Sequence, residues 1–525
     1  MAAETVSVSV SDLDSASSEK AAPGAEAPHR WAITTLVMLA SLMQALDMTI
    51  AVVALPHMQG ALSATQDQMS WVLTSYIVAS AIMMPLSGWL AGRIGRKRLF
   101  LFSIGGFTLA SAFCGMAQTL PEIVIARLLQ GLSGAALSPM SQATLLDITP
   151  PAQHARTMAM WMMGVVVGPI VGPMLGGWLT EDYSWRWVFY INVPFGIACV
   201  LGLMAFMRET PLRRTSFDFF GFVTISVAVA ALQLMLDRGQ GEDWFASPEI
   251  RIEALLAGLA FYLFIVHMLT GDKAKFISPA LFRDRNFVAG NVFIFVVGIG
   301  LFATLALLPP LLQVFLNHPV FDSGLVLAPR GLGTMAASFI VGSLAGRVDP
   351  RLVIAFGLLV NAFSLWLMSG LTLQMDASLI LWSGILQGFG IGFSYAPLAV
   401  LAFATLPPQL RDEGTAMFSL LRNLGSSIGI SLVVALLIRN TQIMHARLGE
   451  HIHPYGTELN GLTPGMLGDG ESLMRLNELV TAQAAMVAYN NDFVFLMVLS
   501  LCLVPLVVLL KPVHAAPKPA TGGGK

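Results

Sequence analysis

The residues most able to do chemistry are four charged side chains inside long apolar runs. Asp47 and Arg127 lie in such runs near the start of the chain, and Arg330 and Arg422 lie in later ones. A charge at the centre of a bilayer costs about 2.5–3.5 kcal/mol on insertion scales, so such groups tend to pair or to face a cavity. An aspartate there can bind and release a proton, while an arginine stays protonated. The pattern predicts proton or ion chemistry inside a membrane.

Asp47 and Arg127 are expected to lie at the same depth. The run that holds Asp47 is expected to cross outward and the run that holds Arg127 to cross inward. Asp47 then lies fewer than ten residues before Pro56, and Arg127 lies fewer than ten residues after Leu120. At about 1.5 Å per residue both side chains lie roughly 10–14 Å below the outer surface. A pair whose proton affinity changes during a cycle is one interpretation, and a static ion pair is the other.

The elements that position these charges must be transmembrane helices. The 525 residues are 55% hydrophobic and 11% charged, and their mean hydropathy is +0.72. A soluble domain carries about 25% charged residues, so this chain has too few to cover an aqueous surface. Its net charge of −2 gives no basic field for nucleic acid. The three cysteines lie in apolar runs and indicate no disulfide framework.

Apolar runs of membrane-spanning length recur along the chain and predict fourteen helices. They lie near 31–55, 70–91, 99–118, 122–145, 157–179, 187–207, 218–236, 252–270, 288–313, 323–345, 352–370, 379–403, 414–438 and 490–510. The seventh and eighth are the weakest, and twelve helices would remain without them. Lysine and arginine gather in the segments that this topology places inside, which predicts that both termini are cytoplasmic.

The runs divide the chain into five parts. These are a disordered cytoplasmic tail 1–30, an N-terminal six-helix bundle 31–213, two inserted helices 214–275, a C-terminal six-helix bundle 276–511 with an external loop 439–489, and a cytoplasmic tail 512–525. No signal peptide precedes the first run. The loop holds His445, His451 and His453, but no cysteine or paired carboxylate accompanies them. We therefore expect a solvated loop and no metal site.

The two bundles repeat one another in sequence. Residues 129–131 match 386–388 at an offset of 257, and residues 88–93 match 342–347 at an offset of 254. Parallel repeats of this kind are typical of transporters that hold substrate between two halves. At these offsets Asp47 corresponds to Thr304 and Arg127 to Gly384. The buried pair exists only in the first half, which favours a functional role over an architectural one.

The fifth run has glycines at every fourth position. Gly164, Gly168, Gly172 and Gly176 share one helix face and allow close approach of a neighbouring helix. Pro169 and Pro173, which belong to the same stretch, each remove a backbone donor and favour a bend. Spacing alone favours simple helix packing.

Six stretches together resemble the major facilitator superfamily. They are residues 46–56, 88–98, 127–131, 164–177, 185–196 and 236–239. Within that family the chain is similar to fourteen-span drug:proton antiporters of the EmrB/QacA type, and the last two stretches lean toward EmrB. The resemblance implies an all-α membrane protein with the major facilitator fold, in which two six-helix repeats flank two inserted helices.

The resemblance also assigns residues to conformational motifs. It implies such roles for Gly88, Arg93, Gly95, Arg96 and Gly131, and for the glycines and prolines of span five, where the family seals its pathway. One departure stands out, because Gly92 occupies a position where the family usually has an acid. A charge relay through that position is therefore unavailable. Arg93, Arg96 and their basic neighbours would latch helix ends, bind lipid head groups or only set the topology.

The resemblance implies a transporter that exchanges lipophilic compounds for protons by alternating access, in the bacterial cytoplasmic membrane. Asp47 and Arg127 would couple the proton, and Gln44, Arg422 and Asn423 are candidates for the substrate cavity. Arg422 contacts substrate in one interpretation and braces a helix in another. The chain has no P-loop, so we expect no nucleotide and no other cofactor. EmrB-like pumps imply two partners, a periplasmic adaptor and an outer-membrane channel.

Three alternatives stay open. Fatty acids or an endogenous metabolite would replace drugs as the substrate. A membrane enzyme of the acyltransferase type would use the pattern from His267 to Asp272, but that pattern lies at a helix end without other catalytic residues. A channel is disfavoured by the parallel repeat. We expect no enzymatic activity.

Overall fold

The protein folds as an array of long helices. The computed structural model describes residues 29–150, 153–212, 216–270, 275–344, 347–450, 452 and 470–511, and no strand occurs among them. The predicted all-α class is confirmed. The two predicted tails lie outside the described residues, apart from residues 29 and 30 of the first tail. The first helix already begins at Arg30.

Fourteen helical segments of the described chain are long and apolar enough to cross a membrane, as predicted. They are α2 (Arg30–Ala61), α3 (Gln66–Ile94), α4 (Arg96–Met116), α5 (Leu120–Gly134) with α6 (Leu137–Ile148), α7 (His154–Asp182), α8 (Trp187–Tyr190) with α9 (Asn192–Phe206), α10 (Phe219–Arg238), α11 (Pro248–Thr270), α13 (Arg285–Pro310) with the π-helix η3 (Leu311–Phe315), α14 (Val320–Leu327) with α15 (Pro329–Leu344), α16 (Pro350–Met368), α17 (Ser378–Ala404), α18 (Arg411–Glu450) and α19 (Gly470–Leu506). A single turn, α12 (Ala280–Arg283), precedes α13.

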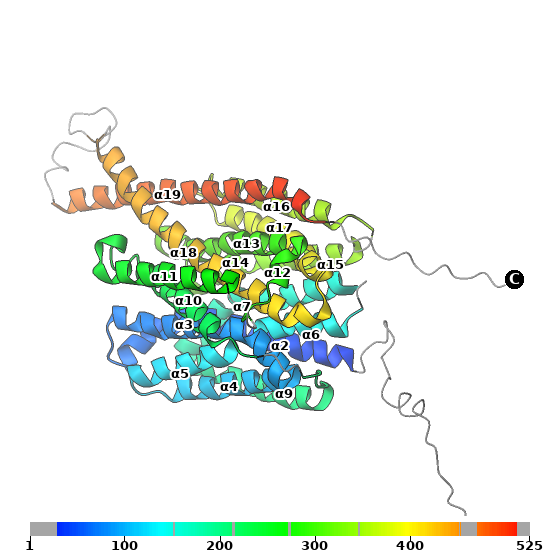
Figure 1. The fold of residues 1–525 in the computed structure, drawn as a ribbon. Coiled ribbons are helices and arrows are strands. Elements are labelled where there is room, and N and C mark those ends of the chain that lie inside the picture. Colours follow the sequence, from blue (N-terminus) through cyan, green and yellow to red (C-terminus); the bar gives the residue numbers. More distant parts are fainter. Residues whose placement is uncertain are drawn as a thin grey trace, which may run out of the picture.

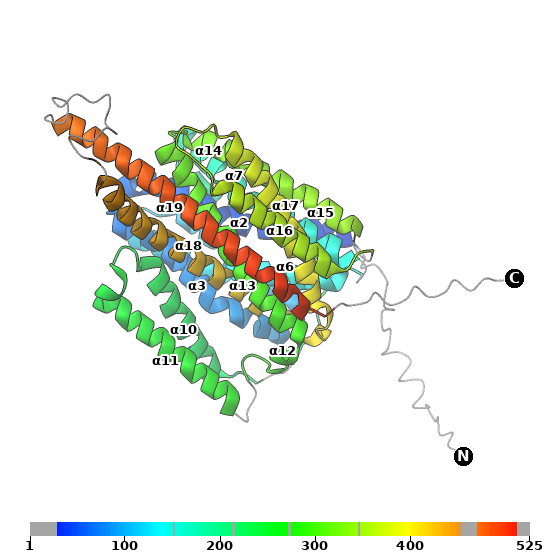
Figure 2. The same cartoon turned by 90° about the horizontal axis from the view of Figure 1, so that it is seen from above.

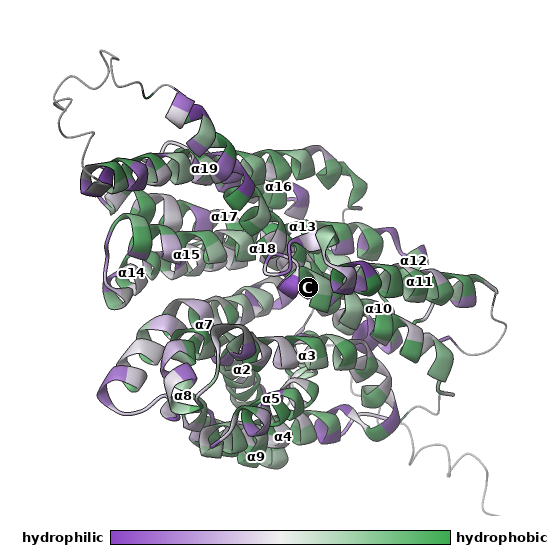
Figure 3. Ribbon diagram, turned by 90° about the vertical axis from the view of Figure 1, so that its left-hand side faces the viewer, coloured by the Kyte–Doolittle hydropathy of each residue, from purple (hydrophilic) through white to green (hydrophobic). Residues whose placement is uncertain are grey.

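The helices form two bundles with a pair of helices at their side. Figure 3, which looks along the helices, shows α2–α9 in one group, α13–α19 in the other and α10 with α11 beside them. The pairing α2 with α7 in the first bundle recurs as α13 with α18 in the second. α10 packs against α3 of the first bundle and α18 of the second. α2 begins and α19 ends at the same end of the molecule (Figure 1).

The glycines of α7 pack this helix against α2. A Cβ on Gly168 would lie 2.8 Å from the backbone nitrogen of Leu46, and one on Gly176 would lie 3.0 Å from the carbonyl oxygen of Ile50. Gly172 faces Thr49 in the same way, whereas a Cβ on Gly164 would meet nothing closer than 3.7 Å. Three of the four glycines therefore permit close helix packing within the first bundle. α7 continues through both of its prolines.

The prediction of a loop over 439–489 is largely wrong. α18 continues to Glu450, and α19 begins at Gly470, so the described part of this stretch is helical apart from Ile452. The segments 439–450 and 470–489 lack proline and are rich in Leu, Met, Ala, Arg and Glu, which are strong helix formers, so polarity here marks exit from the membrane and not loss of the helix. Both helices project beyond the rest of the bundle (Figures 1 and 2).

Of the three histidines in that stretch, only His445 lies within the described residues. Its ring nitrogen Nε2 lies 3.0 Å from Oδ1 of Asn477, so it joins α18 to α19. Across the described chain, no group of three potential metal-ligating side chains forms a site.

Candidate functional site

The predicted meeting of Asp47 and Arg127 occurs inside the first bundle. Asp47 lies on α2 and Arg127 on α5, and Nη1 of Arg127 lies 2.6 Å from Oδ2 of Asp47. Both residues are 0% exposed. The guanidinium also donates from Nε to the carbonyl oxygen of Val72 on α3, at 3.0 Å. The ion pair thus joins three helices and is shielded from bulk solvent by the protein.

Two amide side chains complete the coordination of Asp47. Gln130 and Asn192 each donate to Oδ1 of Asp47 at 2.8 Å. The hydroxyl of Ser111 accepts from the same two amides, at 2.6 Å from Gln130 and 3.3 Å from Asn192. Sequence reasoning did not assign these three residues to the site. One signal was available for Gln130, which follows Arg127 by three positions and so shares its helix face.

Aromatic rings cover the remaining face of the guanidinium. Its central carbon lies 4.4 Å from the ring centroid of Tyr76 and 5.8 Å from that of Phe189. A cation over an aromatic face is stabilised by the ring quadrupole, more so when water is excluded. Gly131 brings Tyr76 this close, because a Cβ at that position would overlap the carbonyl oxygen of Tyr76. The predicted motif residue therefore acts by allowing α5 and α3 to touch.

The predicted substrate-cavity residues lie in different settings. Arg422 of α18 donates to the hydroxyl of Tyr395 and to that of Ser138 on α6, both at 3.2 Å, so it crosses from one bundle to the other. Asn423 also reaches across, with Nδ2 3.8 Å from Sδ of Met84 on α3. Gln44 instead donates to the carbonyl oxygen of Gly134 within the first bundle, at 3.0 Å. Two of the three thus line the contact between the halves.

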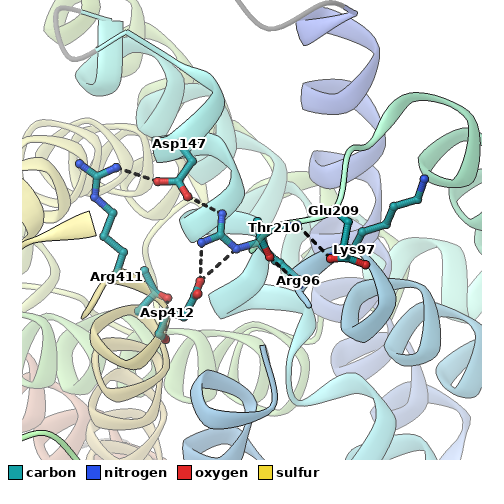
Figure 4. Close-up of polar contacts among 8 residues, drawn as sticks. Arg96, Lys97, Asp147, Glu209, Thr210, Arg411 and Asp412 are labelled. Carbon is teal, nitrogen blue, oxygen red and sulfur yellow. Dashed lines mark hydrogen bonds and ion pairs between the residues drawn. The ribbon is translucent and has the colours of Figure 1, made fainter. Parts of the chain in front are cut away.

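A charged network joins the two halves at the end of the molecule where α2 begins (Figure 4). Arg96, at the start of α4, lies with Nη1 2.5 Å from Oδ2 of Asp147 in α6. Its Nε and Nη2 donate to Oδ1 of Asp412 in the first turn of α18, at 3.0 and 2.6 Å. Arg411 lies 2.7 Å from the other oxygen of Asp147. We call Arg96, Asp147, Arg411 and Asp412 the latch.

Backbone conformation and close helix packing explain why glycines occur around the latch. Gly95 has φ +92°, a backbone conformation that favours glycine, and it is the N-cap of α4. A Cβ on Gly88 would lie 2.8 Å from the Cα of Glu413, so this glycine lets α3 contact α18. Arg93 is exposed and takes no part in the latch. The carboxylates that bond Arg96 come from Asp147 and Asp412, and none comes from position 92.

Comparison with known proteins gives the chain its family. Residues 37–430 match the model of the Major Facilitator Superfamily. The chain belongs to this superfamily. It is 36% identical over 498 residues to the fatty acid resistance protein FarB of Neisseria gonorrhoeae, covering 94% of this chain and 97% of the relative. It is 34% identical over 499 residues to the multidrug export protein EmrB of Escherichia coli K12, covering 94% and 96%.

Solved structures of major facilitators share the fold. The proton:xylose symporter XylE superposes with a TM-score of 0.59 at 14% identity, covering 91% of this chain and 96% of that one. The human organic anion transporter MFSD10 gives 0.57 at 14% identity, covering 90% and 99%. By its family match, its similarity to EmrB and its fourteen apolar helices, the chain is an EmrB-like major facilitator, a multi-pass protein of the bacterial inner membrane. It is a transporter and not an enzyme.

Two further motifs of this major facilitator have structural roles. In the stretch 236–239, Asp237 accepts from Thr74, and the guanidinium of Arg238 lies 5.5 Å from the ring centroid of Trp71, so α10 is anchored to α3. In the acyltransferase-like pattern, Nε2 of His267 lies 2.9 Å from both carboxylate oxygens of Asp218, the N-cap of α10. Asp272 lies outside the described residues.

Proposed function

We propose that this major facilitator exports lipophilic compounds from the bacterial cytoplasm in exchange for protons, as a multidrug efflux pump. The observation that carries the proposal is the buried pair Asp47–Arg127, in which Asp47 is 0% exposed and its Oδ2 lies 2.6 Å from a guanidinium nitrogen. Burying a charged pair in a membrane costs free energy, so such pairs are usually kept for a function. Intramembrane acids often mark proton pathways. The similarity to EmrB, a multidrug export protein, supports the same substrate class.

The proposed cycle moves Asp47 between two environments. In the conformation seen, a guanidinium and two amides donate hydrogen bonds to the carboxylate. While the cytoplasmic side is closed, the carboxyl takes a proton from the outer side and gives up these donors. When the helices around α2 rearrange and the cytoplasmic side opens, the donors bond the carboxylate again and the proton is released inside. Arg127 keeps its charge throughout, and the proton gradient replaces any nucleotide or other cofactor.

The latch is proposed to control which side is open. Its bonds from Arg96 to Asp412 hold α4 and α18 together, and α18 belongs to the opposite bundle. Opening of the inner side requires these bonds to break, because the two halves cannot separate while they persist. The latch therefore stabilises the conformation in which the cytoplasmic side is closed.

The proposed topology places both termini in the cytoplasm. A reporter enzyme that folds only outside should then be active when it is fused after Gly456.

We propose that a periplasmic adaptor docks on the projecting ends of α18 and α19, which we call the outer hairpin (439–450 and 470–489), and that an outer-membrane channel completes the pump. The outer hairpin projects past the other helices (Figure 2). It also presents apolar side chains to solvent, among them Met474 at 70% and Leu479 at 63% exposure. Apolar residues outside the membrane are typical of a protein interface.

Fatty acids form a second candidate substrate class, favoured by the setting of Arg422. Its guanidinium lies between the halves and bonds only to the hydroxyls of Tyr395 and Ser138 among the described residues. A guanidinium with free donors pairs well with a carboxylate. The similarity to the fatty acid resistance protein FarB supports this alternative. Arg422→Gln should reduce fatty acid export more than export of a cationic dye, whereas equal losses would argue for helix bracing.

The experiment that tests the proposed function uses inverted membrane vesicles. An imposed proton gradient should drive uptake of a lipophilic cationic dye, and collapse of the gradient by an ionophore should stop it. Asp47→Asn keeps the shape of the side chain and removes the carboxyl group that can bind a proton. It should abolish gradient-driven uptake, while dye binding and membrane insertion persist. Gradient-driven uptake by Asp47→Asn at the wild-type rate would show that Asp47 is structural.

A further inference from the structure

The second bundle contains a buried polar cluster at the positions that correspond to the Asp47 site. In the first bundle Gln130 donates to Asp47, and in the second Gln387 donates to the hydroxyl of Thr304 at 3.0 Å; each pair is 83 residues apart. A Cβ on Gly131 would overlap the carbonyl oxygen of Tyr76. The equivalent glycine 388 has the same relation to Arg330. Arg330 thus holds the place of Tyr76 in the repeat.

The last helix of each bundle gives the remaining correspondence. Buried positions recur at an offset of 300, where Phe189, Asn192, Leu203 and Met207 of the α8–α9 region correspond to Tyr489, Asp492, Leu503 and Val507 of the α19 region. Asn192 is the residue whose amide bonds Asp47. The second bundle therefore has a carboxyl where the first has an amide. Each bundle thus contains a buried aspartate and a buried arginine. They lie on α2 and α5 in the first bundle and on α19 and α15 in the second.

Asp492 is buried without a counter-charge. It is 0% exposed, and neither of its oxygens receives a hydrogen bond from the described residues. Oε1 of Gln387 is equally without a donor. Three buried acceptors without a donor are unfavourable, because each loses its hydrogen bonds to water. A proton on Asp492 would neutralise the carboxylate and remove the cost of burying its charge.

Among the described residues, the helices that pack against α19 supply no cation to Asp492. α13 and α16 carry their charged residues only at their first turns, Arg285 and Arg351. On α18, the buried Arg422 bonds to two hydroxyls instead. Tyr489 precedes Asp492 by one helical turn. Arg330 on α15 is 3% exposed, and its Nη1 and Nη2 are likewise without acceptors among the described residues.

A small cavity lies close to Asp492 in the second bundle. It measures about 30 Å³ and is lined by Leu496, one turn after Asp492 on α19, and by polar side chains that include Asn361, Ser394 and Ser500. A space of this size with several polar partners suits a water molecule. The cavity thus lies inside the second bundle, between α13, α16, α17 and α19, and begins one helical turn from Asp492.

We propose that Asp492 is a second proton-binding carboxyl, neutral in the conformation seen, and that Arg330 becomes its counter-ion when the second bundle rearranges. Proton binding forms the carboxyl O–H bond with a proton from water on the outer side. Pairing with Arg330 then breaks that bond and releases the proton to water on the inner side. The coupling of this step to export rests on the proposed function, whereas the protonation itself does not. Each exported molecule is then exchanged for two protons.

Infrared difference spectroscopy of the purified full-length protein in lipid vesicles tests the protonation. At neutral pH the wild type should show the C=O stretch of a neutral carboxylic acid, and Asp492→Asn should lose it. Asp492→Glu should shift this band and not remove it. Tyr489→Phe, a matched change of the nearest titratable side chain, should retain it. A spectrum that is identical in wild type and Asp492→Asn would mean that Asp492 is ionised, and the proposal would be wrong.

Simultaneous measurement of proton and dye fluxes in the same vesicles tests the coupling. The ratio of protons to exported dye should fall by about half in Asp492→Asn, because one of two intramembrane carriers is lost. Arg330→Gln should slow proton release while Asp492 keeps its infrared band. An unchanged flux ratio in Asp492→Asn would overturn the coupling role. Absence of proton flux in the wild type would instead refute the proposed function and leave the infrared result standing.

Discussion

Arg96 in the first half and Asp412 in the second are joined by two hydrogen bonds, 3.0 and 2.6 Å long, to a single carboxylate oxygen. The side chain of Arg96 is 5% exposed and that of Asp412 is 17% exposed, so this contact is largely shielded from water. A charge-assisted contact of this kind can hold two rigid bodies in one relative position, and it links halves that the chain connects only through α10 and α11.

Breaking the latch should shift the protein toward an inward-open conformation. Asp412→Asn removes the negative charge of the carboxylate and so weakens its hydrogen bonds from Arg96; a hydrogen bond to a charged group is worth about 1.5–3 kcal/mol. The measurement is the distance between spin labels at Arg93 and Leu352, exposed positions at the latch end of α3 and α16. The distance distribution should move to longer values.

Arg98→Ala is the matched control for the latch. Arg98 is 66% exposed and lies 3.7 Å from Glu209, a surface pair worth about 0–1 kcal/mol. The distribution should stay that of the wild type. If Asp412→Asn also leaves it unchanged, the latch does not hold the closed conformation.

The Asp47–Arg127 pair should show strong energetic coupling in a double-mutant cycle. Arg127→Met alone leaves a buried carboxylate without its counter-charge, which costs about 3–5 kcal/mol. Adding Asp47→Asn to Arg127→Met removes that charge and should recover much of the stability. Thermal unfolding of the purified variants in detergent provides the measurement. Additive effects of the two substitutions would contradict a direct pair.

Close packing at Gly131 predicts a steric effect of a single methyl group. Gly131→Ala should destabilise the first bundle by about 1–3 kcal/mol, because the added Cβ would overlap the carbonyl oxygen of Tyr76. Gly105→Ala is the matched control, since a Cβ there would meet nothing within 4 Å. That variant should be neutral or slightly stabilised. Equal unfolding temperatures for both variants would show that α5 and α3 can separate freely.

Adaptor docking should depend on the apolar side chains of the outer hairpin. Replacing Met474 and Leu479 by serine should reduce co-purification of the periplasmic adaptor, because an interface loses its apolar contacts. Leu255→Ser on α11 is the control, at a similarly exposed position of a helix within the membrane region. Dye transport in inverted vesicles should persist in all three variants. Co-purification that survives both hairpin substitutions would place the adaptor elsewhere.

The sequence by itself determined the number of spans, the repeat of the two bundles and the depth of Asp47 and Arg127. These properties depend on local quantities, the hydropathy of a segment and the rise of a helix, which need no knowledge of neighbours. The same reasoning misjudged 439–489, because polarity was taken as a sign of a loop although helix propensity is high there.

Only the tertiary structure decided which side chains complete each site. Asn192 reaches Asp47 across 145 residues, and Arg96 reaches Asp412 across 316. No periodicity predicts such contacts, because they depend on which helix faces meet and on how far the backbones approach. The same holds for Asp492, whose sequence neighbourhood marks it only as a polar residue near the end of a span. Its burial without a donor follows from the packing of α19 against α16 and α18, which is a property of the folded bundle.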